Sequence, residues 1–252
     1  MAAKDRVETI KSLLLSEGQV KVSLLSQELS VTEETIRRDL EKLEAEGFLI
    51  RTHGGATLNS ARKMADVHFF KRTQRNLSAK RAIARIAISV MERKQAIAAD
   101  ASSTVMEALR LVASRRDLTL LTNSAAVFQE LHDPAVTIVS TGGEYDYSGS
   151  SFFGQGAKKS IEQYHVDLTL LSCKGVGIES GILDTRETDA EIKRAMIGQA
   201  REVALLVDHT KLDRTAFVRV AGLDRLTYLI TDAEPSDAWK HACGEFGIKL
   251  LY

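Results

Sequence analysis

Cysteine and proline are scarce in this chain, whose 252 residues include only two of each. The two cysteines, Cys173 and Cys243, lie far apart, with no CxxC pair and no Cys/His cluster at metal-ligand spacing. This usage argues against a disulfide framework and a structural zinc site, and it is typical of proteins from a reducing cytosol. We therefore expect a cytoplasmic protein without a metal site.

Long apolar runs and net charge are missing as well. The longest apolar runs, such as 203–207, are far too short to span a bilayer, so we expect no membrane partner. No basic segment followed by an apolar stretch opens the sequence as a signal peptide would. The 44% of hydrophobic residues is ordinary for a globular protein, and the length allows one large domain or two unequal ones.

The zero net charge conceals an uneven distribution. The chain has 34 basic and 34 acidic residues, but residues 1–60 carry a net charge of −2, residues 61–85 one of +7 and the remainder one of −5. The basic stretch lies between two differently patterned regions. It is interpreted either as an ordinary solvated face or as a linker that lies near an anion.

The first region predicts three short helices and a hairpin. Apolar residues at helical spacing indicate a helix that ends at Gly18, and Ser23 and Thr32 are candidate caps of the next two helices. The short connection at 30–31 is typical of a helix-turn-helix. Residues 48–56 then predict a strand, a tight Gly-Gly turn and a return strand. Together these elements predict a winged helix.

The third helix has a face suited to DNA. Ile36, Leu40 and Leu43 share one side, which leaves polar residues on the other. An arginine can bond guanine as a fork, and the hairpin would contact the DNA backbone. The alternative is a small helical bundle whose arginines pair with Glu34, Glu41 and Glu44. The DNA-binding residues we predict are Thr32, Glu34, Thr35, Arg37, Arg38, Arg51 and His53.

The second region alternates apolar runs with stretches of helical length. Runs that are buried on both faces and joined by helices indicate a mostly parallel sheet in an α/β domain. The fold class that we predict is therefore α/β, with a winged helix-turn-helix joined to a larger sheet domain. The seven runs are residues 96–99, 118–121, 136–139, 166–171, 203–207, 228–230 and 248–251.

Small polar residues, glycines and lysines follow five of these runs. Because parallel sheets bind ligands at the carboxyl ends of their strands, we expect these loops to form one pocket. Hydroxyls and free N–H groups at a helix start suit a phosphate, lysines balance its charge, and carboxylates accept hydroxyl protons. The pattern predicts a site for a small phosphorylated polyol, although each loop alone is ordinary capping. The loops are 100–104, 122–124, 140–144, 172–175 and 208–211.

The residues also resemble a known family. The segment 32–40 (TEETIRRDL), preceded by Arg6 and followed by 51–56 (RTHGGA), is similar to the helix-turn-helix signature of the DeoR family of bacterial transcriptional regulators. The resemblance implies that Thr35, Arg37 and Arg38 lie on the recognition helix. Asp39 of the same signature is interpreted as structural, anchoring a neighbouring helix or arginine.

The resemblance extends over the second region. It implies a sensor domain similar to ribose-5-phosphate isomerase that binds phosphorylated sugars or related metabolites. One departure is the first loop, in which Ser102 stands where the family usually has glycine. The effector site that we predict consists of Asp100, Ser102, Ser103, Thr104, Asn123, Ser124, Gly142, Gly143, Lys174, Gly175, Asp189, Asp208 and Lys211, with Lys193 close to Asp189.

These features lead to one hypothesis and two alternatives. We expect a homo-oligomeric repressor of a carbohydrate operon that binds double-stranded operator DNA and a phosphorylated sugar. The predicted parts are a DNA-binding domain at 1–58, a basic linker at 59–77 and an effector domain at 78–252. The alternatives are a sugar-phosphate isomerase-like enzyme and a constitutive architectural DNA binder. The sequence lacks GxGxxG, GxxxxGK[ST] and HExxH motifs, so we expect neither catalysis nor a cofactor.

Overall fold

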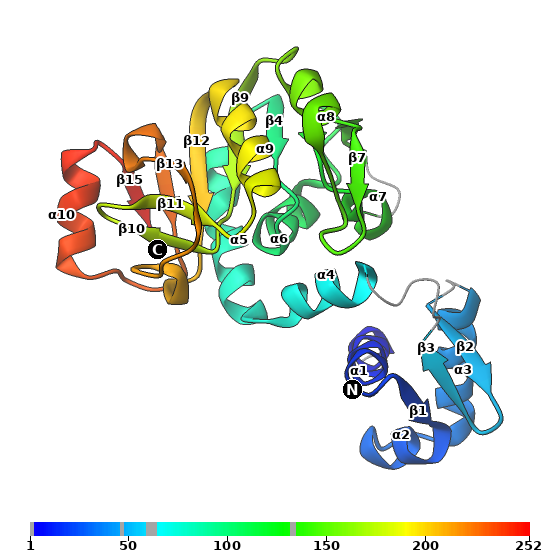
Figure 1. Cartoon of the computed structure of the whole chain (residues 1–252). Helices are drawn as coiled ribbons and strands as arrows, with labels where there is room; N and C mark the ends of the chain where they lie inside the picture. The colour runs from blue at the N-terminus through cyan, green and yellow to red at the C-terminus, as the bar shows by residue number, and fades with distance from the viewer. Residues whose placement is uncertain (1–2, 46–47, 59–64, 132–134) are drawn as a thin grey trace. The chain divides into compact units, whose positions relative to one another are not determined.

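Figure 1 shows the fold of the chain in a computed structural model, which describes residues 3–45, 48–58, 65–131 and 135–252. The contacts divide the chain into two units. Met1–Lys71 form the N-terminal unit and Arg72–Tyr252 form the C-terminal unit. Each unit has a hydrophobic core of its own.

The described residues of the N-terminal unit before α4 form three helices and a small sheet, which confirms the predicted winged helix. Strand β1 was not predicted, and it pairs with β3 to give the sheet order β1-β3-β2. The elements are α1 (Ala3–Glu17), β1 (Gln19–Lys21), α2 (Val22–Glu28), α3 (Glu33–Ala45), β2 (Leu49–Thr52) and β3 (Gly55–Leu58).

Two local predictions in this unit are wrong. Ser23 does not cap α2, because β1 leads directly into the helix and the carbonyl of Gly54 accepts the N–H of Val22 at 3.0 Å. The hairpin turn is not Gly-Gly but His53-Gly54, with Gly54 at a φ of +85°. Gly55 instead begins β3, where a Cβ atom would lie 2.1 Å from the carbonyl oxygen of Val20. This glycine lets β1 and β3 pair.

The core of the N-terminal unit fixes the orientation of α3. Ile36, Leu40 and Leu43 are fully buried, as their spacing predicted. Asp39 is buried beside them, and its Oδ2 accepts a hydrogen bond from Nε of Arg6 on α1 at 2.5 Å. The anchoring role predicted for Asp39 is therefore confirmed, and the opposite face of α3 is left to solvent.

The C-terminal unit is built on a seven-stranded parallel sheet with the order β15-β14-β12-β9-β4-β5-β6 (Figure 1). All seven predicted runs form its strands, which confirms the α/β fold class. The strands are β4 (Ala96–Ala99), β5 (Thr119–Thr122), β6 (Thr137–Ser140), β9 (Val166–Leu171), β12 (Ala200–Leu206), β14 (Tyr228–Ile230) and β15 (Lys249–Leu251).

The strand order reverses between β4 and β9. Strands β4 to β6 run along the sheet in one direction, and the chain then returns to place β9 on the other side of β4. Ligands bind open α/β sheets at such a point. The helices of this unit are α5 (Leu77–Met91), α6 (Ser103–Val112), α7 (Ala126–Glu130), α8 (Gly154–Ile161), α9 (Glu187–Gly198) and α10 (Asp237–Glu245).

Two smaller antiparallel elements were not predicted. Strands β7 (Glu144–Asp146) and β8 (Ser151–Phe153) form a hairpin. A three-stranded sheet has the order β10-β11-β13. Its strands have only three or four residues each, and the first two contain glycine, so they give no clear strand signal in the sequence. They are β10 (Gly175–Gly177), β11 (Gly181–Asp184) and β13 (Val218–Ala221).

Helix α4 (Ala65–Gln74) lies within the segment predicted as a linker. The boundary between the two units falls after Lys71, so the last turn of α4 belongs to the C-terminal unit. Residues 59–64 of the predicted linker lie outside the described residues. Within the described ranges, the structure contains no helix long and apolar enough to cross a membrane.

Candidate functional site

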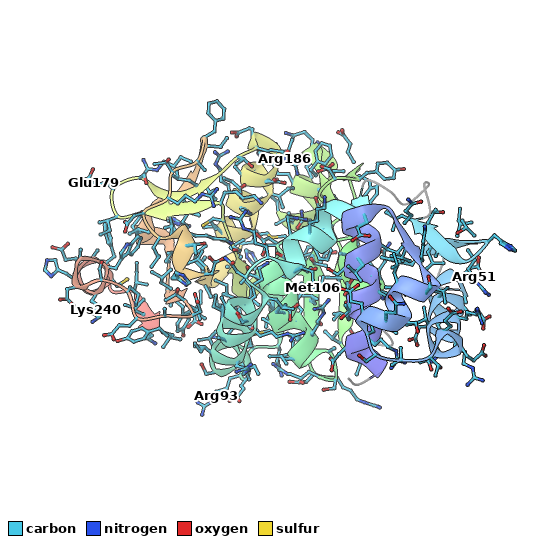
Figure 2. The ribbon with its side chains drawn as sticks, turned by 90° about the horizontal axis from the view of Figure 1, so that it is seen from below. Arg51, Arg93, Met106, Glu179, Arg186 and Lys240 are labelled. Atoms are coloured by element: carbon cyan, nitrogen blue, oxygen red, sulfur yellow. The ribbon has the colours of Figure 1, made fainter. Side chains whose placement is uncertain are left out.

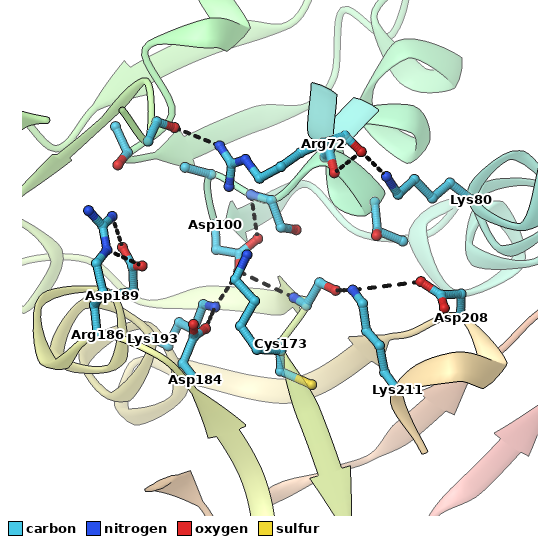
Figure 3. Close-up of a pocket in the computed structure, with 18 of the residues that line it drawn as sticks. Arg72, Lys80, Asp100, Cys173, Asp184, Arg186, Asp189, Lys193, Asp208 and Lys211 are labelled. Atoms are coloured by element: carbon cyan, nitrogen blue, oxygen red, sulfur yellow. Dashed lines mark hydrogen bonds and ion pairs between the residues drawn. The ribbon is translucent and has the colours of Figure 1, made fainter. Parts of the chain in front are cut away.

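A cavity of about 170 Å³ opens in the C-terminal unit at the point where the strand order reverses. Its walls include residues that directly follow four parallel strands: Asp100 after β4, Asn123 after β5, Lys174 just after β9 and Asp208 just after β12. Figure 3 shows charged side chains from these loops and from α9 pointing toward one another. We call this cavity the pocket.

The pocket brings together most of the predicted effector residues. Four of them are not part of its walls. Gly143 and Gly175 serve packing, because a Cβ atom would lie 2.5 Å from the carbonyl oxygen of Phe153 and 2.0 Å from that of Arg214, respectively. The predicted residues in the walls are Asp100, Ser102, Ser103, Thr104, Asn123, Lys174, Asp189, Asp208 and Lys211, and those outside them are Ser124, Gly142, Gly143 and Gly175.

A buried ion cluster forms the floor of the pocket (Figure 3). The ammonium of Lys193 bonds Oδ2 of Asp184 and lies 3.4 Å from Oδ2 of Asp100. Asp100 also accepts the backbone N–H groups of Ser102 at 3.0 Å and Ser172 at 3.2 Å. This carboxylate thus joins the ends of β4 and β9 to α9.

The cluster stays charged despite its burial. Desolvation opposes the charge of Lys193, but the two carboxylates outweigh it and raise the pKa of this lysine. Desolvation likewise opposes the charge of Asp184, and the charge and hydrogen bond of Lys193 lower the pKa of that carboxyl. Lys193 and Asp184 are therefore both ionised at neutral pH.

Cations outnumber carboxylates in the walls of the pocket by eight to four. The N-terminus of α6, with Ser102 as its N-cap, adds the positive end of a helix dipole. The ammonium of Lys174 has no hydrogen-bond or ion-pair partner among the described residues, and burial together with the charge of Arg72 lowers its pKa. Such walls favour an anion. The eight cations are Arg72, Arg75, Lys80, Lys174, Arg186, Lys193, Lys211 and Arg214.

Several wall residues were missed because they come from elements that the pattern did not predict. Asp184 ends the short strand β11, and Arg186 follows that strand. The sequence did contain one signal for the other missed residues. The basic stretch 61–85 was interpreted as a linker that could lie near an anion. The missed side chains from this stretch are Arg72, Arg75, Asn76 and Lys80.

Arg186 holds the β7–β8 hairpin beside the pocket. Its guanidinium forms a fork with Asp189 on α9, with both nitrogen–oxygen distances at 2.9 Å, and donates to Oδ2 of Asp146 at 2.6 Å. These bonds raise the pKa of Arg186, so the link stays charged. Asp189 therefore has two roles: it lines the pocket, and through Arg186 it holds the hairpin in place.

Lys80 is expected to make stability depend on pH. Burial, followed by the nearby charge of Lys211, lowers the pKa of Lys80 to about 8. The unfolded chain keeps this proton up to about pH 10.4, so between these values the unfolded state binds more protons and stability rises with pH. We predict that the Tm of the wild type, relative to that of Lys80→Met, increases between about pH 7 and pH 9.5. Thermal unfolding measures this difference, and a flat or falling difference contradicts the assignment.

Cys173 lies in the wall without reactive character. Burial raises the pKa of its thiol to about 11, so the thiol is protonated at neutral pH. Its 4% exposure indicates that this cysteine packs in the interior just after β9. Among the described residues there is no group of histidines, cysteines and carboxylates that could hold a metal ion.

The exposed face of α3 carries the predicted DNA-binding side chains. Arg37 pairs with Glu33 at 2.7 Å, and Arg38 pairs with Glu34 at 3.3 Å. The side chain of Arg38 remains 72% exposed. Exposed pairs at this helical spacing are worth only about 0.3–0.5 kcal/mol, so exchanging a glutamate for DNA costs little.

The remaining predicted residues border this face. Thr32 accepts the N–H of Thr35 at 3.3 Å, which confirms that it caps α3. Arg51 on β2 (Figure 2) pairs with Glu41 at 2.8 Å, and His53 is exposed in the hairpin turn. The guanidinium groups of Arg38 and Arg51 thus pair with acids, as the helical-bundle alternative predicted, whereas Glu44 accepts only the backbone N–H of Arg51.

Two domain families match the chain. The DeoR-like helix-turn-helix domain matches residues 6–62, and the DeoR C terminal sensor domain matches residues 75–233. Among solved structures, the chain is similar to a D-ribose-5-phosphate isomerase in complex with phospho-erythronic acid, with 16% identity, a TM-score of 0.39 and coverage of 53% of this chain and 52% of that chain. A likeness at this level carries no functional argument.

Three curated relatives match the chain over most of both lengths. The uncharacterized HTH-type transcriptional regulator YulB of Bacillus subtilis strain 168 is 37% identical over 92% of this chain and 90% of its own. The HTH-type transcriptional repressor GlcR of the same strain is 31% identical over 100% and 96%, and the L-fucose operon activator of Haemophilus influenzae is 30% identical over 98% and 98%. The chain therefore belongs to the DeoR family of DNA-binding transcriptional regulators.

Proposed function

We propose that this regulator represses a carbohydrate-utilisation operon, and that a phosphorylated sugar bound in the pocket modulates its affinity for operator DNA. The observation that carries the proposal is the excess of cations over carboxylates around the cavity, eight against four. A sugar phosphate joins a compact anion to several hydroxyls, so it can use both kinds of side chain.

The phosphate is proposed to lie at the start of α6. Ser102, Ser103 and Thr104 offer hydroxyls there, together with the first N–H groups of the helix. Lys174 is available as a counter-ion, because its ammonium has no partner among the described residues. These groups match the charge and the acceptor oxygens of a phosphate.

The hydroxyls of the sugar are proposed to face the carboxylates. An ionised carboxylate has about four acceptor sites, and those of Asp100 are only partly used by two N–H groups and Lys193. Asp208 accepts from Asn76 and Thr210, both at 3.2 Å, and retains capacity for a further donor. Acceptors of this kind suit a polyol.

The sign of regulation and the class of operon are proposed from the relatives. GlcR is named a repressor, and the Haemophilus relative is named an activator of the L-fucose operon. Repression is the simpler mechanism for a protein whose effector shifts it between DNA-binding and non-binding states, because it needs no contact with polymerase. The site of action is then the cytoplasm.

The protein is proposed to bind DNA as a dimer or tetramer. Two recognition helices in one oligomer can read two half-sites of the operator, which gives higher specificity than one helix alone. The half-sites are expected to lie one helical turn of DNA, or a multiple of it, apart. Sedimentation velocity of the full chain, with and without operator DNA, checks this point. A monomer that binds a single half-site at full affinity argues against it.

A thermal-shift screen tests the proposed ligand. The full chain is heated with pentose and hexose phosphates, with the same sugars without phosphate and with inorganic phosphate. A specific ligand at about 100 times its Kd stabilises the folded state by about 2.7 kcal/mol. We expect one sugar phosphate to raise the Tm and its parent sugar to leave it unchanged. No response to any phosphorylated sugar counts against the proposal.

The alternative function is a sugar-phosphate isomerase-like enzyme. The sugar phosphate found in the thermal-shift screen can also be used to distinguish this enzyme from a regulator. The support for the enzyme is the cluster of carboxylates and lysines in the pocket, which are side chains used in general acid–base catalysis. We expect no turnover of the stabilising sugar phosphate by the purified chain. Conversion of that compound to an isomer would favour the enzyme.

A further inference from the structure

The last turn of α4 forms part of the pocket wall. The final four carbonyl groups of an α-helix have no partner within the helix, so each must find one elsewhere. In α4 these groups belong to Lys71, Arg72, Thr73 and Gln74. The carbonyl of Arg72 is satisfied by two side chains of the pocket.

The two donors come from different helices. The ammonium of Lys80 on α5 bonds the Arg72 carbonyl oxygen, and the hydroxyl of Ser103 on α6 donates to the same oxygen at 3.2 Å. Figure 3 shows Lys80 reaching this carbonyl from the edge of the pocket. We call these two bonds the α4 clamp. Both Lys80 and Ser103 are also wall residues, so the donors that hold α4 face the space available to a ligand.

The Arg72 side chain holds the same turn from another direction. Its Nη2 donates to the carbonyl of Gly149 at 2.9 Å, in the connection between β7 and β8. Arg72, Lys80 and Ser103 all line the pocket. α4 is also the segment of chain that continues from the N-terminal unit into the C-terminal unit.

The surroundings of Lys80 disfavour its charge. The residue Lys80 is only 4% exposed, and the charges near its ammonium include those of the cations Lys211 and Arg72. A carbonyl oxygen carries only a partial charge, so it compensates a buried ammonium less well than a phosphate does. An incoming anion is thus a better partner for Lys80 than the carbonyl it holds.

We propose that Lys80 and Ser103 are positioning residues for α4: an anion bound in the pocket takes both donors from the Arg72 carbonyl and so loosens the last turn of this helix. This proposal rests on the proposed function, since it requires an anionic effector. It identifies the route by which occupancy of the pocket alters the segment that leads to the DNA-binding unit.

Hydrogen exchange of the full-length protein tests the clamp first without a ligand. In Lys80→Met and in Ser103→Ala we expect the amides near the end of α4, residues 69–76, to exchange about five- to tenfold faster than in the wild type, the effect of one lost hydrogen bond. Ser103→Ala is the milder change and guards against a folding defect in Lys80→Met. Lys158→Met on α8 is the matched control, because Lys158 pairs with Glu191 and bonds no residue of α4 among the described residues, so its α4 amides should exchange as in the wild type.

Inorganic phosphate then serves as the probe of the response, with sodium chloride at equal ionic strength as its control. In the wild type we expect phosphate to raise the Tm and to speed exchange at 69–76, whereas in Lys80→Met exchange should already be fast and gain little. A purely structural role for Lys80 would leave the phosphate-dependent increment intact and would overturn the proposal. A normal increase in Tm with unchanged α4 exchange also overturns it, while leaving the proposed function standing. No increase in Tm contradicts the anion site itself, and both proposals fail together.

Discussion

Replacing Lys193 by methionine is expected to lower the free energy of unfolding of the C-terminal unit by about 3–5 kcal/mol, because removing one partner of a buried ion cluster leaves the others uncompensated. Lys193 is 8% exposed and lies against two carboxylates that are even more deeply buried. Methionine nearly matches the length of the lysine side chain and removes only its charge. Urea unfolding followed by circular dichroism measures the loss.

A matched control uses the same substitution at an exposed lysine. Lys240 on α10 (Figure 2) pairs with Glu234 at 2.6 Å and with Asp237 at 3.3 Å on the surface. Surface substitutions of this kind change stability by about 0.5 kcal/mol or less. If Lys193→Met cost no more than Lys240→Met, the cluster would not be the stabilising floor of the pocket.

The stabilisation by the cluster should be confined to a window of pH. The lowered pKa of Asp184 makes its contribution complete above the unfolded value of about 3.9, and the contribution is lost as pH falls through the folded pKa. The raised pKa of Lys193 makes its contribution complete below about pH 10.4, and it is lost as pH rises through the folded pKa. The difference between the wild type and Lys193→Met is therefore expected to be greatest between about pH 4 and pH 10.

Replacing Arg38 by alanine is expected to weaken operator binding by about 1–3 kcal/mol, or roughly 5- to 150-fold, if its guanidinium reads a base edge. The fixed core of α3 turns Arg38 away from the domain, and its weak exposed pair with Glu34 leaves it free to exchange partners. Fluorescence anisotropy with an operator selected from random DNA by the wild-type protein measures the loss.

Two comparisons separate base reading from simple charge. Arg93 projects from the surface of the C-terminal unit (Figure 2), so Arg93→Ala removes the same charge away from α3 and should leave affinity unchanged. A base-reading arginine should also relax specificity at one position, whereas a phosphate contact would weaken all sequences about equally. An operator preference unaltered in Arg38→Ala would contradict the assignment.

Buried apolar runs made the large sheet predictable from sequence. Strands such as Ala96–Ala99 are buried on both faces, so they are continuous apolar segments with clear ends. The small sheets depend instead on tertiary contacts. Gly175 and Gly181 in β10 and β11 are required because carbonyl groups of other segments approach them closely, and no local pattern reports such an approach.

The strand pattern predicted wall residues only where they follow predicted strands, and Asp189 on α9 came instead from the family resemblance. Asp100, Lys174 and Asp208 were found because the carboxyl ends of parallel strands meet at one edge. Arg72 and Lys80 come from outside the sheet, and only the folded chain shows that the basic stretch contributes to the pocket. The glycines after β6 were wrongly assigned to the walls because Gly143 packs against α8.

The structure also shows where many of the cations of this neutral chain lie. Several cations of the basic stretch line the pocket, and the arginines of α3 are paired with glutamates of the same helix. On the described face of α3 these arginines are thus partly neutralised, and we expect modest non-specific affinity with a shallow dependence on salt. Specific base contacts then carry a larger share of operator recognition.

The central claim is that occupancy of the pocket changes affinity for operator DNA. The most direct test measures operator binding by the full chain with and without the sugar phosphate that raises its Tm, and repeats the measurement with Asp100→Ala. The account predicts a change of about 5- to 150-fold in the wild type, equivalent to a coupling of about 1–3 kcal/mol. It predicts intact operator binding without a response in Asp100→Ala. An operator affinity in the wild type that is indifferent to every stabilising sugar phosphate would contradict the account and favour a constitutive DNA binder.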